Sequence, residues 1–388
     1  MMAQTYQFKA PSVIVNGPGA SKEVGSFGKG IGKKALIVTD TALEQKGVLN
    51  EIKNSLEMAG VAYSVYNKVV NEPTMGYTEE GLKAFKDSGA DFLIAVGGGS
   101  PIDAAKAIAA LATNPGRKVT EFLGANKIAN PGSPLIAIPT TAGTGSEVTQ
   151  FTIITDTDRD VKMLIASPMI MPRVALVDPL LTLSMSQNIT MATGLDALTH
   201  AIEAYVSVKA HPLTDTLALQ AIRIIAANLR QAWSNGDNVE ARTHMMIGSL
   251  HAGMAFSNAS VALVHGMARP IGAYFHVPHG VSNAALLPIV IEFSIPGNPR
   301  RYADIAAAMG EITEGLSLLD AAYLAAEAVE RLNDDLKVPT LEELGVEEEK
   351  FNKLLERMAE DAIASGSPGN NPRKATKEEI VELYKKAY

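Results

Sequence analysis

One aspartate and three histidines have the residue types and the spacing of a metal site. All seven histidines of the 388-residue chain lie between His200 and His279. Asp196 and His200 are four residues apart in a segment that reads as a helix, so their side chains share one face. His265 and His279 frame the segment HGMARPIGAYFHVPHG, whose glycines and prolines should break helical order and direct both imidazoles toward one point. These four residues are the candidate metal ligands.

An aspartate with three neutral imidazoles favours Fe(II), Zn(II) or Mn(II), because Ca(II) and Mg(II) prefer more oxygen ligands. The chain contains no cysteine, which excludes thiolate ligands and disulfides. The alternative interpretation is a surface pair of Asp196 and His200, with two ordinary polar histidines further on. His276 lies three residues before His279 and is a candidate to face the same cleft. The remaining histidines are expected to be structural or solvated: His211, His244 and His251.

Two glycine-rich loops, each after an apolar strand, are candidates to bind phosphate. The first contains Gly97, Gly98, Gly99 and Ser100 and precedes a helix whose free N–H groups and positive dipole end suit a diphosphate. Ser100 is expected to cap that helix, with Pro101 in its first turn. The second loop, PTTAGTGSE, spans residues 139–147 and is rich in hydroxyl groups and glycine. Either loop alone could be a tight turn without a ligand, but together they predict a phosphate-bearing ligand at the carboxyl edge of a sheet.

The kind of nucleotide is suggested by an acid and by an absent motif. Neither loop contains GxGxxG, which argues against the standard Rossmann arrangement. Asp40 ends the first strong strand, where it could bind both ribose hydroxyls and repel a 2′-phosphate, favouring NAD over NADP. Its alternative role is to cap the helix that follows.

The order of apolar patterns predicts an α/β domain over residues 1–180 and an all-helical domain over residues 181–388. The first half alternates strands and helices, which implies a parallel sheet with helices on both faces. Strands are expected at 35–40, 63–66, 91–96, 135–138 and 174–177, with a hairpin within 151–165 and helices at 43–59, 78–88 and after Gly99. The second half has helical periodicity at 190–208, 213–235, 239–256, 288–308, 318–332 and 377–388, with a loop at 365–373.

Composition limits the partners. With 47% apolar and 20% charged residues the chain should be a compact soluble protein, and its net charge of −8 gives no attraction to nucleic acid or anionic lipid. The first residues have no basic region followed by an apolar one, and no run of 18 apolar residues occurs. We therefore expect a cytoplasmic protein with neither a membrane nor a nucleic acid as partner.

Four ordered motifs carry a resemblance to a known family: GGGSPIDAAKAIA, PTTAGTGSE, GLDALTHAIEAYVS and HGMARPIGAYFHVPHG. The chain resembles the iron-dependent (group III) alcohol dehydrogenases, with their lactaldehyde reductase, methanol dehydrogenase and 1,3-propanediol dehydrogenase branches. The resemblance covers essentially the whole chain. It implies a dehydroquinate synthase-like architecture, in which an N-terminal dinucleotide-binding α/β domain and a C-terminal all-α domain bring NAD and a metal together in the cleft between them.

The resemblance also implies roles for individual residues. The family's metal ligands match Asp196, His200, His265 and His279. Its cofactor-binding residues match Asp40, Gly97, Gly98, Gly99, Ser100, Asp103, Thr140, Thr141 and Ser146. Single-residue matches add Asn71, Thr149 and Lys162 beside the nicotinamide ribose, and Phe151 and Phe256 as walls of the substrate pocket.

One residue departs from the family pattern. Many members have histidine four residues after the third metal ligand, where it is linked to proton movement, and this chain has Arg269. An arginine stays protonated and cannot accept a proton at neutral pH. His276 is a candidate to replace the histidine, and Arg269 is a candidate to bind an anionic group of the substrate or cofactor.

The expected function is reversible hydride transfer between NAD and a small primary alcohol or diol, with Fe(II) or else Zn(II) as Lewis acid. Two alternatives remain at this point. A dehydroquinate synthase-like lyase would need a basic cluster, for which Arg269, Arg300 and Arg301 are the near candidates. A non-catalytic nucleotide-binding protein would hold a purely structural metal in a closed shell. Family members form dimers and larger assemblies, and the segment Tyr6 to Val15 could pair across two chains.

Overall fold

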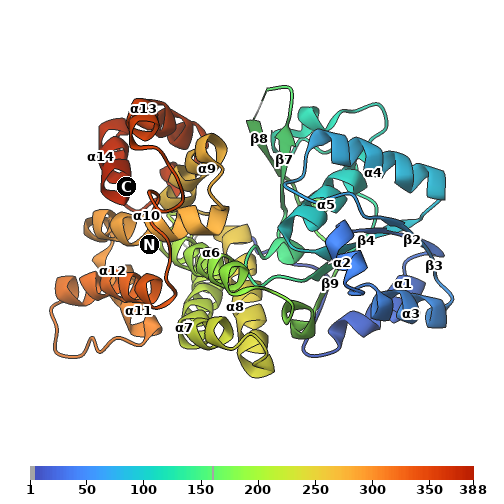
Figure 1. The fold of residues 1–388 in the computed structure, drawn as a ribbon, viewed down its shortest axis with the longest axis horizontal. Helices are drawn as coiled ribbons and strands as arrows, with labels where there is room; N and C mark the ends of the chain where they lie inside the picture. Colours follow the sequence, from blue (N-terminus) through green and yellow to red (C-terminus); the bar gives the residue numbers. More distant parts are fainter. Residues whose placement is uncertain (1–4, 160) are drawn as a thin grey trace. The chain divides into compact units, whose positions relative to one another are not determined.

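The computed structural model describes residues 5–159 and 161–388 and divides the chain into two compact units (Figure 1). The α/β unit spans Lys9–Ser184. The helical unit begins at Met185, slightly later than the expected boundary at 180, and residues 5–8 group with it. The fold class expected from the sequence, an α/β unit followed by a helical one, is confirmed.

The α/β unit is built on a six-stranded sheet in which every pairing is parallel. Its strand order is β1-β9-β6-β4-β2-β3. The strands are β1 (Val13–Asn16), β2 (Lys34–Val38), β3 (Ala62–Tyr66), β4 (Phe92–Gly97), β6 (Leu135–Pro139) and β9 (Val174–Val177). Five of them match the predicted strands, because short runs of buried β-branched residues are the signal of strands covered on both faces.

Helices cover both faces of this sheet, and alternate residues of each strand point to opposite faces (Figure 1). Ile37 and Ile94 pack with α1 (Val24–Lys29) and α3 (Asn50–Ala59). Leu36 and Leu93 pack on the other face with α4 (Met75–Ser88) and α5 (Gly99–Thr113). The sheet is therefore the buried middle layer of the unit.

Two helices of the α/β unit differ from their prediction. The helix expected at 43–59 is two, α2 (Thr41–Gln45) and α3, because Gly47, with φ of 73°, breaks it. The N-cap of α5 is Gly98 in an extended conformation, so the prediction that Ser100 caps this helix was wrong. Ser100 lies inside the first turn, as does Pro101.

A second, smaller sheet of three strands, in the order β5-β8-β7, lies against the other side of α5. It contains β5 (Gly124–Ala125) and the antiparallel hairpin of β7 (Phe151–Asp156) and β8 (Val161–Ala166). The predicted hairpin is confirmed. Short 3-10 helices complete the unit: Ala20–Glu23, Val119–Phe122, Ser146–Val148, Pro168–Ile170 and Pro179–Thr182.

The strand order places a ligand site at one position of the large sheet. The chain goes from β2 outward to β3 and then returns to add β4, β6 and β9 on the other side, so the direction reverses between β2 and β4. Ligands of open parallel sheets bind at the carboxyl ends of the strands at such a reversal. Asp40 follows β2 and Gly98 follows β4, so two of the predicted cofactor residues lie at this position.

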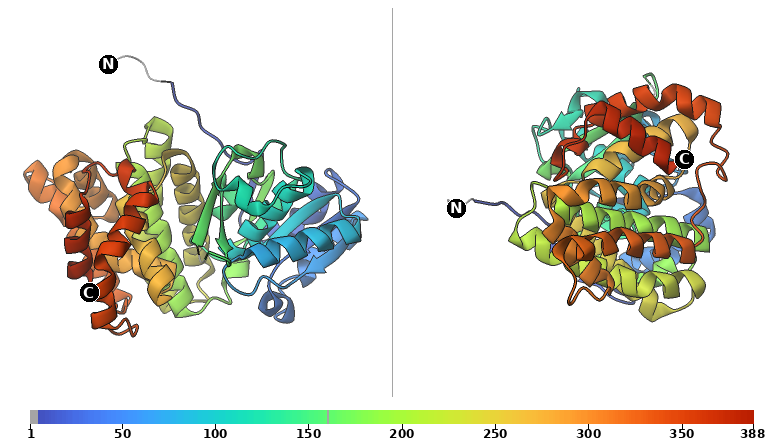
Figure 2. Two further views of the ribbon diagram at one scale, coloured as in Figure 1. Left: turned by 90° about the horizontal axis from the view of Figure 1, so that it is seen from above. Right: turned by 90° about the vertical axis from the view of Figure 1, so that its left-hand side faces the viewer.

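Every described element of the helical unit after Ser184 is a helix, as the two views of Figure 2 show in yellow-green to red. The helices are α6 (Gln187–Val206), α7 (Pro212–Ser234), α8 (Val239–Ala259), α9 (Leu263–Phe275), α10 (His279–Ser294), α11 (Pro299–Met309), α12 (Leu318–Asp335), α13 (Glu348–Ala364) and α14 (Lys377–Ala387), with 3-10 turns at Ile295–Gly297 and Ser367–Asn370. Helix α6 packs against α7, α8 and α10, and α10 also contacts α9, α12 and α14. These two helices form the core of the unit.

The prediction that glycines and prolines break helical order after His265 was right only at 276–278, where Pro278 precedes α10, and wrong for the residues before it. Residues Leu263–Phe275 are helical with Pro270 inside, and α10 begins at His279 with Pro288 inside. The helix expected at 288–308 is instead the end of α10 and all of α11. Each proline removes one N–H donor, and burial of the apolar residues around it stabilises these helices against that loss.

The N-terminal segment is held within its own chain at both ends. Val13–Asn16 forms edge strand β1 and pairs with β9, and Tyr6 stacks on His211 of the helical unit with ring centroids 4.8 Å apart. Pairing of Val13–Val15 with a second chain could therefore use only the free edge of β1. The segment His279–Gly297 is apolar and long enough to cross a membrane, but 67% of it is buried in the protein.

The close contact of α10 with α6 gives a test of how the fold positions His279. A Cβ atom built on Gly280 would overlap the backbone carbonyl of Ala192 in α6. We expect Gly280→Ala to push the two helices apart and to lower the free energy of unfolding by about 1 to 3 kcal/mol. Urea denaturation measures this change.

The matched control is Gly369→Ala, because a Cβ on Gly369 meets no atom within 4 Å. Equal stability of the two variants would contradict the close helix contact.

Candidate metal centre and cofactor pocket

Helix α6 contributes three buried polar side chains to the candidate metal centre. Asp196, His200 and Glu203 follow one another at intervals of four and three residues, so they lie along one face of the helix. Their exposed fractions are 4%, 6% and 2%. Burial of three polar side chains on one helix face is costly unless each has a partner, and α9 and α10 provide these partners.

Three of the four predicted ligands converge. The ligand atoms of Asp196, His265 and His279 all lie within 4.8 Å of one another. Asp196 Oδ1 is 3.6 Å from His265 Nε2 and 3.8 Å from His279 Nε2. Both distances from Asp196 are short enough for the two atoms to share a transition-metal ion at the roughly 2.0–2.2 Å that such ligands prefer.

His200 lies next to this group but is not one of its three members. Its Nδ1 is 3.8 Å from Asp196 Oδ2, and its ring stacks on His265 at 4.4 Å and on Phe256 at 4.1 Å. Phe256, the predicted pocket wall, thus packs directly on a predicted ligand. The role of His200 as fourth ligand remains a prediction.

The protonation states suit a cation. Burial alone would raise the pKa of Asp196, but the charge of His200 and contact with His265 hold it well below its usual range, so the carboxylate is ionised. Desolvation lowers the pKa of His279, and the nearby charges of His265 and Arg269 lower it further. The side chain is 41% exposed, which weakens the effect of desolvation. His279 is therefore the neutral imidazole that a metal requires.

Glu203 holds His265 in place. Its Oε2 atom is 2.6 Å from His265 Nδ1, and its Oε1 accepts the backbone N–H of Val264 at 2.6 Å. It therefore satisfies a free N–H at the start of α9 and fixes the proton of His265 on Nδ1, which leaves Nε2 free for a metal. Burial would lower the pKa of His265, but hydrogen bonds with Asp196 and Glu203 raise it.

Asn283 touches all three converging ligands. Its Nδ2 donates to Asp196 Oδ1 at 2.8 Å and lies 3.3 Å from His265 Nε2 and 3.4 Å from His279 Nε2. Asn283 is fully buried, and its Oδ1 has no hydrogen-bond partner among the described residues. The amide donor therefore faces the three ligand atoms and fixes the orientation of the Asp196 carboxylate beside His265 and His279.

Arg269 and His276 lie on α9 but in different settings. Arg269 Nη1 donates to Ser367 Oγ at 3.0 Å, and its charge acts on both Glu203 and His279. His276 is the exposed C-terminal cap of α9, with φ of 57°. The proximity of Arg269 to the centre is thus evident, whereas the role of His276 in the substrate pocket remains a prediction.

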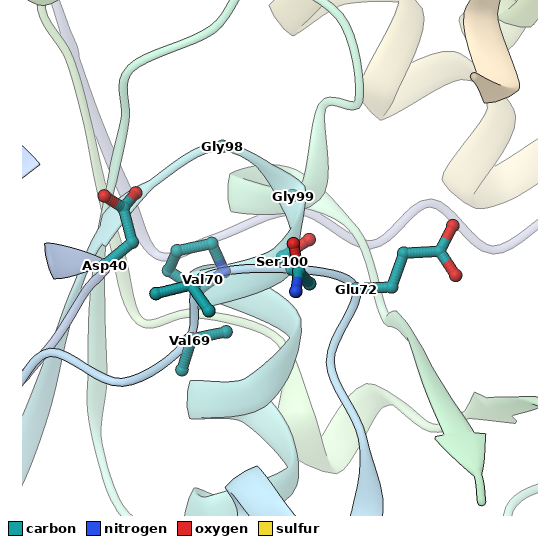
Figure 3. Close-up of a pocket in the computed structure, with 9 residues that line it drawn as sticks. Asp40, Val69, Val70, Glu72, Gly98, Gly99 and Ser100 are labelled. Carbon is teal, nitrogen blue, oxygen red and sulfur yellow. The ribbon is translucent and has the colours of Figure 1, made fainter. Parts of the chain in front are cut away.

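The α/β unit has a pocket of about 310 Å³ at the reversal between β2 and β4 (Figure 3). Five predicted cofactor residues line it: Asp40, Asn71, Gly98, Gly99 and Ser100. Its other lining residues are Val69, Val70, Glu72 and Pro101. Lys162 reaches its edge, because its Nζ pairs with Glu72 at 2.6 Å. The structure therefore brings these separate sequence positions together.

The structure also shows the alternative roles, a helix cap for Asp40 and a tight turn for the first glycine-rich loop. Asp40 Oδ1 accepts the N–H of Leu43 at 2.7 Å and so caps α2, which leaves its other oxygen for a ligand. The glycines permit close packing: a Cβ on Gly98 would lie 3.3 Å from the Thr141 side chain, and one on Gly99 would lie 2.9 Å from Thr144. Gly97, with φ of 153°, turns the chain out of β4.

The second loop is joined to α5 by a buried polar network. Ser146 Oγ donates to Asp103 Oδ1 at 2.6 Å, and fully buried Lys106 donates to Ser146, Thr149 and the carbonyl of Phe151 at 3.0, 2.9 and 2.7 Å. Thr140 continues from β6 and donates its N–H to the Gly97 carbonyl at 3.0 Å. Asp103 and Lys106 of α5 thus bind Ser146 of the second loop and Thr149 just after it. These contacts fix the second loop against the helix that follows the first loop.

Burial shifts the charges of this network. It lowers the pKa of Lys106 to about 8, although Asp103 and Glu147 act in the opposite direction. It raises the pKa of Glu147 to about 7, against a backbone hydrogen bond and Lys106. The α5–loop contact therefore contains groups whose charge changes near neutral pH.

A parallel α/β unit with a pocket at its strand reversal, and a helical unit with an Asp-His cluster, are typical of a nucleotide- and metal-dependent enzyme. The chain matches the family model of iron-containing alcohol dehydrogenase over residues 11–179 and that of the C-terminal part of the Fe-containing alcohol dehydrogenase family over residues 190–388. The chain belongs to the iron-containing alcohol dehydrogenase family.

Relatives agree over the full length. The chain is 43% identical to a 1,3-propanediol dehydrogenase of Citrobacter freundii, covering 100% of both chains. It is 41% identical to an NAD-dependent methanol dehydrogenase of Bacillus methanolicus, covering 98% of this chain and 99% of that one. A crystal structure of 1,3-propanediol oxidoreductase superposes with a TM-score of 0.96 at 42% identity, over 99% of this chain and 100% of that one. Family and relatives together make the chain an alcohol dehydrogenase.

Three functional residues were absent from the sequence prediction: Glu203, Asn283 and Lys106. Glu203 and Asn283 had a usable signal, since they lie seven and four residues after Asp196 and His279 and so on the same helix faces. Lys106 had none, because a lysine inside a helix normally extends to solvent.

Glu203 gives a test of the support around His265. In Glu203→Gln the group facing Nδ1 can be an amide N–H, which cannot accept the imidazole proton. We expect the affinity for ferrous or zinc ion to fall by about 10- to 100-fold. Competition with a chelator at fixed pH measures it, with Glu349→Gln on exposed α13 as the control. Unchanged affinity in Glu203→Gln would show that the His265–Glu203 contact does not support the metal.

Proposed function

We propose that this chain oxidises a small primary alcohol or diol reversibly with NAD on a ferrous ion held by Asp196, His200, His265 and His279. Zinc is the alternative ion, since both accept these ligands. The convergence of Asp196, His265 and His279 within 4.8 Å carries the proposal. When bound, the ion supplies Lewis acidity toward the alcohol oxygen, and NAD accepts the hydride.

The protein's own part in metal binding follows from the side chains around the centre. Asp196 contributes the charge, and its ionised state allows it to bind a cation. Glu203 keeps His265 Nε2 free, and Asn283 orients the Asp196 carboxylate through its 2.8 Å hydrogen bond. His279, with its 41% exposed side chain, leaves one side of the centre accessible. That side is where an alcohol would enter.

The cofactor would bind in the pocket at the β2–β4 reversal. The N–H groups at the start of α5, next to Gly97, Gly98, Gly99 and Ser100, suit the diphosphate. The free oxygen of Asp40 suits an adenosine ribose with an unmodified 2′-hydroxyl, which favours NAD. Asn71, Thr140, Thr141 and Lys162 are proposed contacts further along the dinucleotide. Asp103, Ser146 and Thr149 would support these contacts through the Lys106 network.

Neither alternative function fits as well. A dehydroquinate synthase-like lyase needs a cluster of free basic side chains for phosphate, yet Arg301 forms a two-point ion pair with Asp215 at 2.7 and 2.9 Å and so cannot join Arg269 in such a cluster. A purely structural metal needs a closed ligand shell. The exposed side chain of His279 argues against such a shell. Family membership also favours the dehydrogenase.

Three wider properties belong to the same proposal. The NAD-binding domain would span residues 1–180 and the metal-binding domain residues 181–388, a division supported by the compact units on either side of Ser184. A cytoplasmic location is the second of these properties. The unpaired edge of β1 supports a homodimer or larger homo-oligomer.

His265→Ala tests the metal site. Removing this ligand should abolish tight metal binding and lower kcat by about 1,000-fold, because Lewis-acid catalysis contributes several kcal/mol to the barrier. NAD binding should persist, since the pocket lies in the α/β unit. Metal content by elemental analysis, NADH formation and an NAD titration measure the three properties.

His244→Ala is the control, because His244 is a half-buried histidine of α8 outside the centre. Full turnover of His265→Ala without bound metal would refute the proposal.

A further inference from the structure

We propose that Arg269 forms an anion subsite beside the metal centre, so that the preferred substrates are short alcohols with a carboxylate or sulfonate group. This inference rests on the proposed dehydrogenase function. Its experimental test separates the two, because a neutral diol serves as a reference substrate throughout.

Arg269 lies next to the centre on the same helix as one ligand. It follows His265 by four residues on α9, so the two side chains share a face, with Cβ atoms about 5–6 Å apart. The Arg269 charge also acts on His279, which lies at the start of α10. A substrate bound at these two histidines would therefore come within reach of the guanidinium.

The guanidinium has no carboxylate partner among the described residues. Its Nη1 donates a hydrogen bond of 3.0 Å to Ser367 Oγ, which is a neutral hydroxyl. The nearest acid in electrostatic terms is Glu203, whose oxygens are already occupied by Val264 N–H and His265 Nδ1 at 2.6 Å each. Asp196 is likewise held by Asn283. Most of the five donors of Arg269 are thus available to a ligand.

The net positive charge of the centre with a divalent ion bound also favours an anionic ligand. Asp196 and Glu203 together cancel the charge of a divalent ion, with the histidines neutral as ligands. The permanent charge of Arg269 then leaves one excess positive charge in a partly desolvated site. An unpaired charge of this kind is unfavourable. A carboxylate or sulfonate would neutralise it, and a neutral alkanol would not.

Geometry selects the size of the substrate. The planar guanidinium can bind two oxygens of a carboxylate or sulfonate at once. One helical turn separates Arg269 from His265, so a short substrate with its anionic group close to the hydroxyl-bearing carbon is expected to reach both side chains. Arg269 is half-buried, which leaves it open to a molecule entering from solvent. Short ω-hydroxy acids fit these limits.

The test compares three alcohols with metal-loaded enzyme and NAD: 1,3-propanediol, 3-hydroxypropanoate and 2-hydroxyethanesulfonate. We expect wild-type kcat/KM to be at least about tenfold higher for one or both anionic substrates than for the diol. In Arg269→Gln the ratio of anionic to neutral kcat/KM should fall by about 10- to 100-fold, mainly through KM. Arg269→Lys should retain part of the preference, because it keeps the charge but not the two-point geometry.

The control variant is Arg331→Gln, which removes one positive charge from an exposed position of α12. It should leave the substrate ratio unchanged. If Arg269→Gln does not fold, inhibition of wild-type diol oxidation gives the second measurement: propanoate or ethanesulfonate should compete with the diol at least tenfold more strongly than propanamide.

The outcomes distinguish the two proposals. Turnover of the diol with no preference for either anion, and equal losses on all three alcohols in Arg269→Gln, would overturn the anion subsite and leave Arg269 as a structural partner of Ser367. No NADH from any alcohol, with metal and NAD bound, would instead overturn the proposed dehydrogenase reaction.

Discussion

The candidate centre depends on one imidazole held between two buried carboxylates of a single helix. His265 has its Nδ1 2.6 Å from Glu203 and its Nε2 3.6 Å from Asp196, and both acids come from α6, two turns apart. Because Glu203 also accepts the N–H of Val264, the same contact fixes the start of α9. One interaction therefore sets where α9 begins, how the His265 ring is oriented and where its Nε2 atom lies. His279 comes from α10, which packs on both α6 and α9.

The cofactor pocket depends on a different constraint, the direction of the parallel strands. Reversal of the strand order between β2 and β4 brings Asp40 and Gly98 to the same edge of the sheet, although they are far apart in the sequence. The second loop is positioned by Lys106, whose charge is buried in the contact of α5 with that loop. A buried ammonium ion tolerates few arrangements of its partners, which restricts the conformation of the loop.

Sequence patterns predicted most of the fold. Strand positions followed from short β-branched runs, and the two-unit plan followed from the change of periodicity near residue 180. Helix α9 was missed because Pro270 and two glycines are breakers locally, and only packing in the helical unit decides that they are tolerated. The N-cap of α5 was predicted at Ser100 but lies at Gly98, because the backbone of Gly98 is extended and the helix begins directly after it. Helix α13 was missed outright, since its polar residues outnumber the five that it buries.

The candidate site was predicted less completely than the fold. Asp196, His265 and His279 have a spacing that can be recognised, and the structure brings them together. Glu203 and Asn283 share helix faces with predicted ligands, but their contacts depend on how α6, α9 and α10 pack. Among the described residues Arg269 has no carboxylate partner, which is also a property of packing alone and supports the anion-binding role that the sequence left open.

The central claim is that one ion is held by these side chains, and anomalous X-ray diffraction at the iron edge tests it most directly. Crystals loaded anaerobically with ferrous ion should show a single peak about 2.1 Å from a carboxylate oxygen of Asp196 and from Nε2 of His265 and His279. A peak at other residues, or none at these three in crystals of enzyme that oxidises alcohols, would contradict the account.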